Sequence, residues 1–179
     1  MTEAEQELQR RLDECRSNQL PRLDISLLGL TELPQEIADF TWLTELWFGN
    51  NQIADISPLA RLTNLTGLWI YNNQIADFSP LVNLIKLTKL YCGGNQIVDL
   101  SPLAGLTNLT ELYCGCNHIA DLSPLARLTE LTELSCYDNR IVDLNPLIGL
   151  IKLTELGCGD NQIVDVSPLA GLTKLTIFN

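Results

Sequence analysis

Hydrophobic positions along this chain recur with a period of 22 residues over most of its length. Written with Φ for an apolar residue, each period reads LxxLxΦxxNxIxDΦxPLxxLxx, and the pattern holds over residues 43–174. Four columns mark it most clearly: leucines (Leu43, Leu65, Leu87, Leu109, Leu131, Leu153, Leu175), asparagines (Asn51, Asn73, Asn95, Asn117, Asn139, Asn161), aspartates (Asp55, Asp77, Asp99, Asp121, Asp143, Asp165) and prolines (Pro58, Pro80, Pro102, Pro124, Pro146, Pro168). Self-similarity this strict predicts a stack of equivalent structural units.

The first half of each unit predicts a short strand that ends in a turn. In Leu46-Trp47-Phe48 the alternation has period two, so Leu46 and Phe48 face the core and Trp47 faces outward. Asn51 follows where the chain must turn, and an amide side chain there can bond unpaired backbone groups. Because the asparagine recurs in every unit, we expect an inward ladder of amides along the stack.

The second half of each unit predicts a single 3₁₀-like turn. Ser57-Pro58 resembles a helix cap followed by a first-turn proline, and too few residues remain before the next unit for a full helix. Asp55 lies just before this turn, where its carboxylate can accept backbone hydrogen bonds. Such bonds are needed to offset the repulsion between aspartates on neighbouring units.

One unit cannot bury its own apolar face, so the units must stack with their strands in parallel. We therefore predict an α/β solenoid: a curved rod with a parallel sheet on the concave side and 3₁₀ turns on the convex side. Residues 1–19 form a capping helix, in which Ala4, Leu8, Leu12 and Cys15 share one face. Residues 20–42 are an atypical first repeat with Leu28 in the asparagine position, 43–174 are six regular repeats, and 175–179 begin a truncated one.

The unit LTKLYCGGNQIVDLSPLAGLTN resembles the 22-residue class of leucine-rich repeats known from internalins and their intracellular relatives. The start of the chain, EAEQELQRRLDECRSNQLPRLDISLLGLTELPQEI, is similar to the opening of bacterial, especially cyanobacterial, leucine-rich-repeat proteins of the Roco type. Those proteins carry a GTPase module further along the chain, so the resemblance implies the recognition part of a larger signalling protein. The GxxxxGK[ST] phosphate loop does not occur in this sequence, and GTPase activity is not carried over to its residues.

Charge narrows the choice of partner. Acidic residues outnumber basic ones 22 to 11, for a net charge of −11. A phosphate backbone must be met by Lys and Arg, so nucleic acid and anionic membrane are not expected partners, and a basic protein segment fits better. The sequence has no apolar stretch long enough to span a bilayer, and its acidic start lacks the features of a secretory signal. We therefore expect a cytoplasmic protein with its six cysteines reduced.

Outward positions of the strands carry the expected contact surface. Counting the leading leucine as one, the fifth position reads Trp47, Trp69, Tyr91, Tyr113, Ser135, Gly157, and the third reads Glu45, Gly67, Lys89, Glu111, Glu133, Glu155. The seventh holds Tyr71 and Tyr137 among Gly49, Gly93, Gly115 and Gly159, and the eighth reads Asn50, Asn72, Gly94, Cys116, Asp138, Asp160.

Two interpretations of this surface stay open. The rings can simply stack along the sheet and stabilise it. Alternatively, exposed Trp and Tyr beside small glycines form a contact patch, since large aromatics are enriched in binding hot spots. We favour the contact patch, polarised toward the capped end of the rod. Its expected residues are Trp47, Trp69, Tyr71, Tyr91, Tyr113 and Tyr137, flanked by Glu45, Lys89, Glu111 and Glu133.

The sequence offers little for chemistry. Cys92, Cys114, Cys136 and Cys158 fall on the inward sixth position, where a linear column suits apolar packing better than tetrahedral metal binding. Parallel side chains also point the same way, which disfavours disulfides between units. Cys116 lies on an outward position and is the candidate reactive thiol. The one histidine, His118, falls on a variable exposed position, so no nucleophile with a base, carboxylate pair or metal site is expected.

The expected function is therefore a non-catalytic protein- or peptide-binding scaffold without a metal or cofactor. A glycan-binding module is the first alternative, because Trp and Tyr also stack on sugar faces. A self-assembly element is the second, because the repeat pattern stops at Leu175 without a polar cap. An uncapped end predicts either a fragment of a longer protein, which we favour, or an end covered by self-association.

Overall fold

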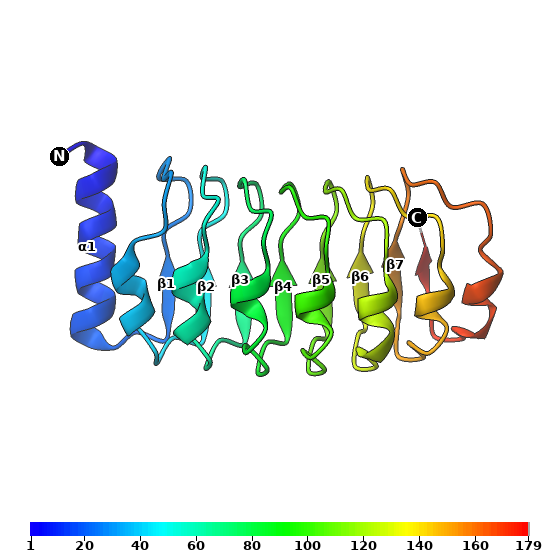
Figure 1. Cartoon of the computed structure of the whole chain (residues 1–179). Helices are drawn as coiled ribbons and strands as arrows, with labels where there is room; N and C mark the ends of the chain where they lie inside the picture. The colour runs from blue at the N-terminus through cyan, green and yellow to red at the C-terminus, as the bar shows by residue number, and fades with distance from the viewer. Residues whose placement is uncertain (179) are drawn as a thin grey trace.

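A computed structural model describes residues 1–178 as one helix followed by eight parallel strands in a single sheet. The strands pair in chain order, so each repeat adds one strand to the sheet (Figure 1). The helix is α1 (Glu3–Asn18), and the strands are β1 (Arg22–Asp24), β2 (Glu45–Trp47), β3 (Gly67–Trp69), β4 (Lys89–Tyr91), β5 (Glu111–Tyr113), β6 (Glu133–Ser135), β7 (Glu155–Gly157) and β8 (Ile177–Phe178). The predicted α/β solenoid is confirmed.

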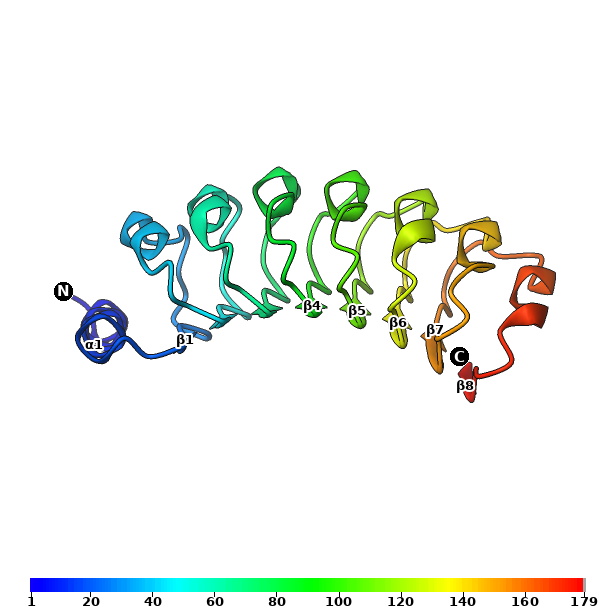
Figure 2. The same ribbon diagram turned by 90° about the horizontal axis from the view of Figure 1, so that it is seen from below.

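The rod curves because its two sides have different widths. Strands lie side by side along the inner side, while the 3₁₀ turns spread more widely along the outer side (Figure 2). These turns span Gln35–Asp39, Ser57–Arg61, Ser79–Leu81, Ser101–Leu103, Ser123–Arg127, Asn145–Leu147 and Ser167–Gly171. Hydrogen bonding holds parallel strands about 4.8 Å apart, whereas the bulkier turns need more room, so the strand side becomes concave.

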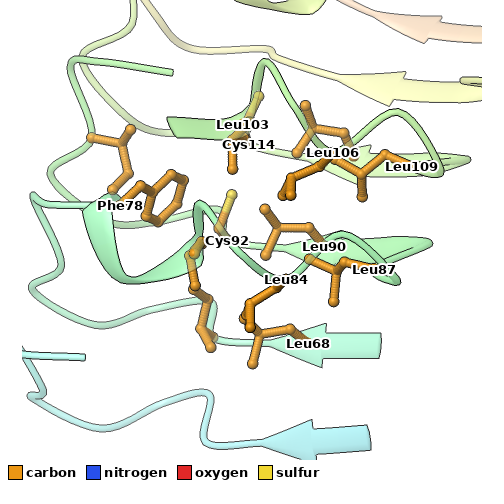
Figure 3. Close-up of a cluster of buried hydrophobic side chains, with 14 of the residues drawn as sticks. Leu68, Phe78, Leu84, Leu87, Leu90, Cys92, Leu103, Leu106, Leu109 and Cys114 are labelled. Carbon is orange, nitrogen blue, oxygen red and sulfur yellow. The ribbon is translucent and has the colours of Figure 1, made fainter. Parts of the chain in front are cut away.

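The core is a continuous apolar column between the sheet and the turns. Equivalent leucines pair between neighbouring strands from β1 to β7, as Leu68 does with Leu90 and Leu90 with Leu112. Figure 3 shows part of this column, where Cys92 and Cys114 lie among leucines and Phe78. Both cysteines are fully buried, so the inward direction predicted for the sixth position is confirmed.

The predicted amide ladder is also confirmed. Asn95 accepts a hydrogen bond from the backbone N–H of Ile75 at 3.0 Å and donates to the carbonyls of Ile70 and Cys92 at 3.0 Å each. The same pattern recurs in each regular unit. Every amide therefore joins the turn of its own unit to the preceding unit and satisfies backbone groups that water cannot reach.

One detail of the convex turn differs from the prediction. Ser57 does not cap the 3₁₀ turn, because Ile56 occupies the cap position and no side chain bonds there. The hydrogen bond predicted for Asp55 is confirmed: its carboxylate accepts the backbone N–H of Ser57 at 2.8 Å and the Ser57 hydroxyl at 3.0 Å. A carboxylate two residues earlier reaches the free N–H groups better than the short serine side chain does. In the equivalent pair, bonds from Ser79 hold the pKa of Asp77 below its ordinary value.

Helix α1 covers the first strand at one end of the rod. Thr2 and Glu5 form a reciprocal capping box at its start, and Leu12 and Cys15 are buried against the core. Arg11 donates to the carbonyl of Asp24 at 2.9 Å, which satisfies an edge group of β1. The helix thus protects a sheet edge that would otherwise be free to pair with another chain.

Candidate binding surface on the concave face

Four rings stack in one column along the concave face. We call Trp47, Trp69, Tyr91 and Tyr113 the aromatic ladder. Ring centroids are 4.4 Å apart between the two tryptophans, 5.7 Å between Trp69 and Tyr91, and 4.4 Å between the two tyrosines. Neighbouring planes are inclined by 7 to 21°, so each ring covers its neighbour's face.

Strand register produces this column directly. Trp47 pairs with Trp69, Trp69 with Tyr91, and Tyr91 with Tyr113, so side chains at the fifth position meet on the same face. Each ring is half-buried because its neighbours cover its faces, while its edge remains at the surface. Stacked pairs of this kind contribute about 0.5–1.5 kcal/mol each beyond their area burial. The rings therefore stack along the sheet, as the first interpretation predicted. The stack forms an ordered aromatic surface on the concave side.

An acidic column beside the ladder holds the tyrosines in place. The Tyr91 hydroxyl donates to Glu111 and the Tyr113 hydroxyl to Glu133, both at 2.5 Å. Lys89 bonds the other oxygen of Glu111 at 2.7 Å. Burial raises the pKa of Glu111, but hydrogen bonds from Lys89 and Tyr91 outweigh it and leave that pKa below its ordinary value. The charged flank of the expected contact patch is thus partly engaged within the chain.

These contacts predict abnormal ionisation of two tyrosines. Burial and the bond to Glu111 raise the pKa of Tyr91 well above its ordinary 10.0, and the bond to Glu133 and burial do the same for Tyr113. The folded state favours the neutral phenols, so their stabilisation is present below pH 10 and is lost as pH rises through the folded values. Contact with Cys116 also raises the pKa of Tyr137. Ultraviolet absorbance during alkaline titration should therefore show Tyr91 and Tyr113 among the phenols that ionise late, with one late phenol fewer in Tyr91→Phe and in Tyr113→Phe. Full ionisation near pH 10 in the folded protein would contradict this arrangement.

A second aromatic column is shorter and more exposed. Tyr71 is half-buried and Tyr137 is 46% exposed. Each covers a glycine on the preceding strand, since a Cβ at Gly49 would lie 2.7 Å from the Tyr71 ring and one at Gly115 would lie 2.4 Å from the Tyr137 ring. The rings thus lie beside small glycines, as expected, but they cover these two glycines and do not leave them open. At both positions the absence of a Cβ leaves room for the aromatic ring, and at Gly67 it leaves room for the ring of Trp69.

The eighth position has a backbone role that the sequence reasoning missed. Asn50, Asn72, Cys116, Asp138 and Asp160 all adopt positive φ, between 51 and 55°. Residues here turn the chain out of the strand in the left-handed region, where Asn, Asp and Gly are favoured. The run of Asn, Gly and Asp in this column was the available signal. Cys116 is the exception in type, and its partly exposed thiol remains a predicted reactive site.

The other cysteines are poor nucleophiles. Burial raises the pKa of Cys92, Cys114, Cys136 and Cys158, and all six cysteines are free. Within residues 1–178, no three His, Cys, Asp or Glu side chains come together as a metal site. No helix in that range is long and apolar enough to cross a membrane.

Comparisons with known proteins place this surface in context. The family profile described as leucine rich repeats (2 copies) matches residues 41–83, 85–127 and 129–171. An internalin C2 (inlC2) structure from Listeria monocytogenes is 40% identical with a TM-score of 0.74, over 89% of this chain and 80% of its own. An internalin (inlF) from the same organism is 35% identical with a TM-score of 0.77, over 88% of this chain and 53% of its own, so the chain spans about half its length.

A leucine-rich-repeat protein from Leptospira interrogans is also similar. It is 30% identical with a TM-score of 0.78, over 83% of this chain and 39% of its own. The search of curated proteins finds no match. The solved relatives therefore agree on repeat architecture.

Proposed function

The chain belongs to the leucine-rich-repeat family, and on this basis we propose that it binds a protein or peptide on its concave face. Proteins of this family are generally non-catalytic binding scaffolds. The observation that carries the proposal is the aromatic ladder, four ring edges fixed side by side on a concave surface. The ladder forms the centre of the contact, with Tyr71 and Tyr137 beside it.

Rigidity favours binding by these rings. Each ring is held by its stacked neighbours, and the two tyrosines are also anchored by carboxylates. A surface that is already ordered loses little side-chain entropy when a partner binds. Aromatic residues ordered in this way are typical of hot spots in protein interfaces.

The charge of this face favours a basic partner. Glu111 and Glu133 lie directly beside the ladder, and Glu155 continues their column toward the far end. Glu45 pairs with Arg22 and Glu111 with Lys89, but within residues 1–178 Glu133 and Glu155 have no basic partner. Two carboxylates without a basic partner and a net charge of −11 would attract Lys and Arg side chains.

Stacking favours a peptide over a glycan. A sugar bound by an aromatic residue lies flat on an open ring face. Within the ladder the faces of neighbouring rings cover each other, and mainly edges meet the solvent. Side chains of a peptide can pack against such edges, whereas pyranose faces cannot.

We also propose that the chain acts in the cytoplasm as the recognition part of a larger signalling protein with a GTPase module. Its buried, unpaired cysteines support a reducing compartment. The similarity of its first residues to Roco-type proteins supports the wider context.

Selection from a random peptide display library tests the binding proposal. Peptides selected on the native chain are compared on the concave double variant Trp69→Ala/Tyr91→Ala and on the control Val98→Ala/Val142→Ala. Both valines are exposed outside the ladder, and equivalent positions already hold Ala54, Ala76 and Ala120. We expect the selection to yield Arg- or Lys-rich peptides. These should bind the native and control chains but should no longer bind the concave double variant. Failure to enrich any sequence, or equal binding to both variants, would overturn the proposal.

A further inference from the structure

The aromatic ladder ends abruptly at Tyr113 and leaves a slot beside its open ring face. Ser135 pairs with Tyr113 in register and Gly157 pairs with Ser135, but both residues are too small to continue the stack. A hollow of about 160 Å³ occupies this place, lined by Tyr113, Glu133, Ser135, Glu155 and Gly157 together with the backbone of β6 and β7. It is smaller than the roughly 300–1,000 Å³ of small-molecule sites and suits the end group of one side chain.

At the opposite end of the ladder, the open face of Trp47 is covered by a cation from the chain itself. There the guanidinium of Arg22 lies over the ring of Trp47, with its carbon 5.9 Å from the ring centroid. The same guanidinium bonds both oxygens of Glu45, at 2.9 Å and 3.3 Å. The fold thus already closes one end of the ladder with a planar cation held by an aromatic face and a carboxylate.

The Tyr113 end offers the same two groups without the cation. Its outer ring face is covered by neither a ring nor a basic side chain within the described residues. Glu133 lies beside it and accepts the Tyr113 hydroxyl through one oxygen, which leaves the other oxygen available. Glu155 lies one strand further, and its carboxylate has no hydrogen-bond or salt-bridge partner in residues 1–178.

We propose that the slot beside Tyr113 binds an arginine side chain of the partner, stacked on the Tyr113 ring and paired with Glu133 and Glu155. Strands are about 4.8 Å apart, so the two small residues leave a gap about 10 Å long for a planar guanidinium and the chain that carries it. Arginine fits better than lysine because its flat, delocalised head can stack and form a fork of hydrogen bonds at once. This inference deepens the proposed function and rests on it, since it assigns one anchor of the bound peptide.

The chain offers a variant that fills the slot without disturbing the fold. Ser135→Tyr extends the ladder by one ring, with Glu155 placed to accept its hydroxyl as Glu111 and Glu133 do for the preceding tyrosines. We expect this variant to melt at or above the native temperature and to exclude an arginine side chain. Val98→Tyr adds the same ring at an exposed site outside the slot and serves as the matched control. Glu155→Gln removes one charge without changing the shape of the slot.

The test is an NMR titration of the full chain with N-acetyl-arginine amide. We expect millimolar affinity that weakens with added salt, with shifts concentrated on the Tyr113 ring and on Glu133 and Glu155. Binding should fall by about tenfold or more in Ser135→Tyr, fall less in Glu155→Gln, and stay unchanged in Val98→Tyr. N-acetyl-citrulline amide, which is flat but uncharged, should bind much more weakly.

Several results would overturn the assignment. They are equal binding by N-acetyl-lysine amide, N-acetyl-tyrosine amide or a methyl glycoside, or shifts at Tyr113 that survive in Ser135→Tyr. Suppose that the titration shows no arginine binding, while selected peptides bind the ladder with the same affinity in Ser135→Tyr. The arginine site would then be wrong, and the proposal of a binding scaffold would be unaffected. Arginine binding in the slot with no selectable peptide would overturn the scaffold proposal and support the slot alone.

Discussion

Replacing Asn117 with alanine is expected to lower the free energy of unfolding by about 3–5 kcal/mol. The buried amide accepts the backbone N–H of Ile97 at 2.9 Å and donates to the carbonyls of Cys114 and Cys92 at 3.0 and 3.2 Å. Alanine leaves the Ile97 N–H buried without a partner, at about 1–3 kcal/mol, and removes one of the two amide bonds to each carbonyl, at about 0.5–1.5 kcal/mol each. The Cys92 and Cys114 carbonyls keep their bonds from Asn95 and Asn139. Because the amide joins two adjacent units, its loss also weakens the coupling along the rod.

Chemical denaturation followed by circular dichroism measures this effect, with two comparisons in the same chain. Asn161 makes the same kind of bonds but is only part-buried, so Asn161→Ala should cost less because water can replace the amide. Asn108 is exposed and bonds one carbonyl on the convex side, and its replacement should cost under about 1 kcal/mol. Equal costs at all three positions would show that the ladder is not what holds adjacent units together.

Replacing Trp69 with alanine is expected to weaken binding of a selected peptide by about 30- to 900-fold. The estimate follows from hot-spot losses of about 2–4 kcal/mol. Trp69 lies in the middle of the ladder, stacked on Trp47 at 4.4 Å and on Tyr91 at 5.7 Å. Its removal deletes one contact edge and also frees both neighbouring rings, so the surface loses its order. Isothermal titration calorimetry measures the change.

A conservative variant separates lost contact from lost fold. Trp69→Tyr places in the third strand the ring that the fourth and fifth strands already carry, so it should retain most of the affinity. Val98→Ala should bind as the native chain does. An affinity that is unchanged in Trp69→Ala, while the variant keeps the native circular dichroism spectrum, would show that the ladder serves only to stabilise the sheet.

Much of the fold follows from the period alone. Spacing of 22 residues, strand alternation and the recurring asparagine predict parallel strands, the concave side, the inward cysteines and the amide ladder. The cap of the 3₁₀ turn was assigned wrongly, because serine before proline resembles a helix start. The position of Asp55 before the turn did predict its bond to a backbone N–H, but spacing does not express whether the Ser57 side chain also reaches one.

The surface was less predictable, because its contacts run between repeats. Column positions predict that Trp47, Trp69, Tyr91 and Tyr113 face the same side, and the structure brings these four together. Column positions do not reveal that the Tyr91 hydroxyl bonds the glutamate of the next strand, or that the Tyr137 ring packs on Gly115. Such contacts depend on the direction in which each side chain lies along the rod. Period and polarity leave that direction undetermined.

Cross-saturation NMR on the complex with a selected peptide shows whether the concave face is the binding surface. Irradiation of the peptide protons identifies the protein residues in contact with it, independently of any substitution. We expect the strongest transfer of saturation to the rings of Trp47, Trp69, Tyr91 and Tyr113, with weaker transfer to Tyr71 and Tyr137. Transfer concentrated on the convex 3₁₀ turns, with the ladder rings unaffected, would contradict this expectation.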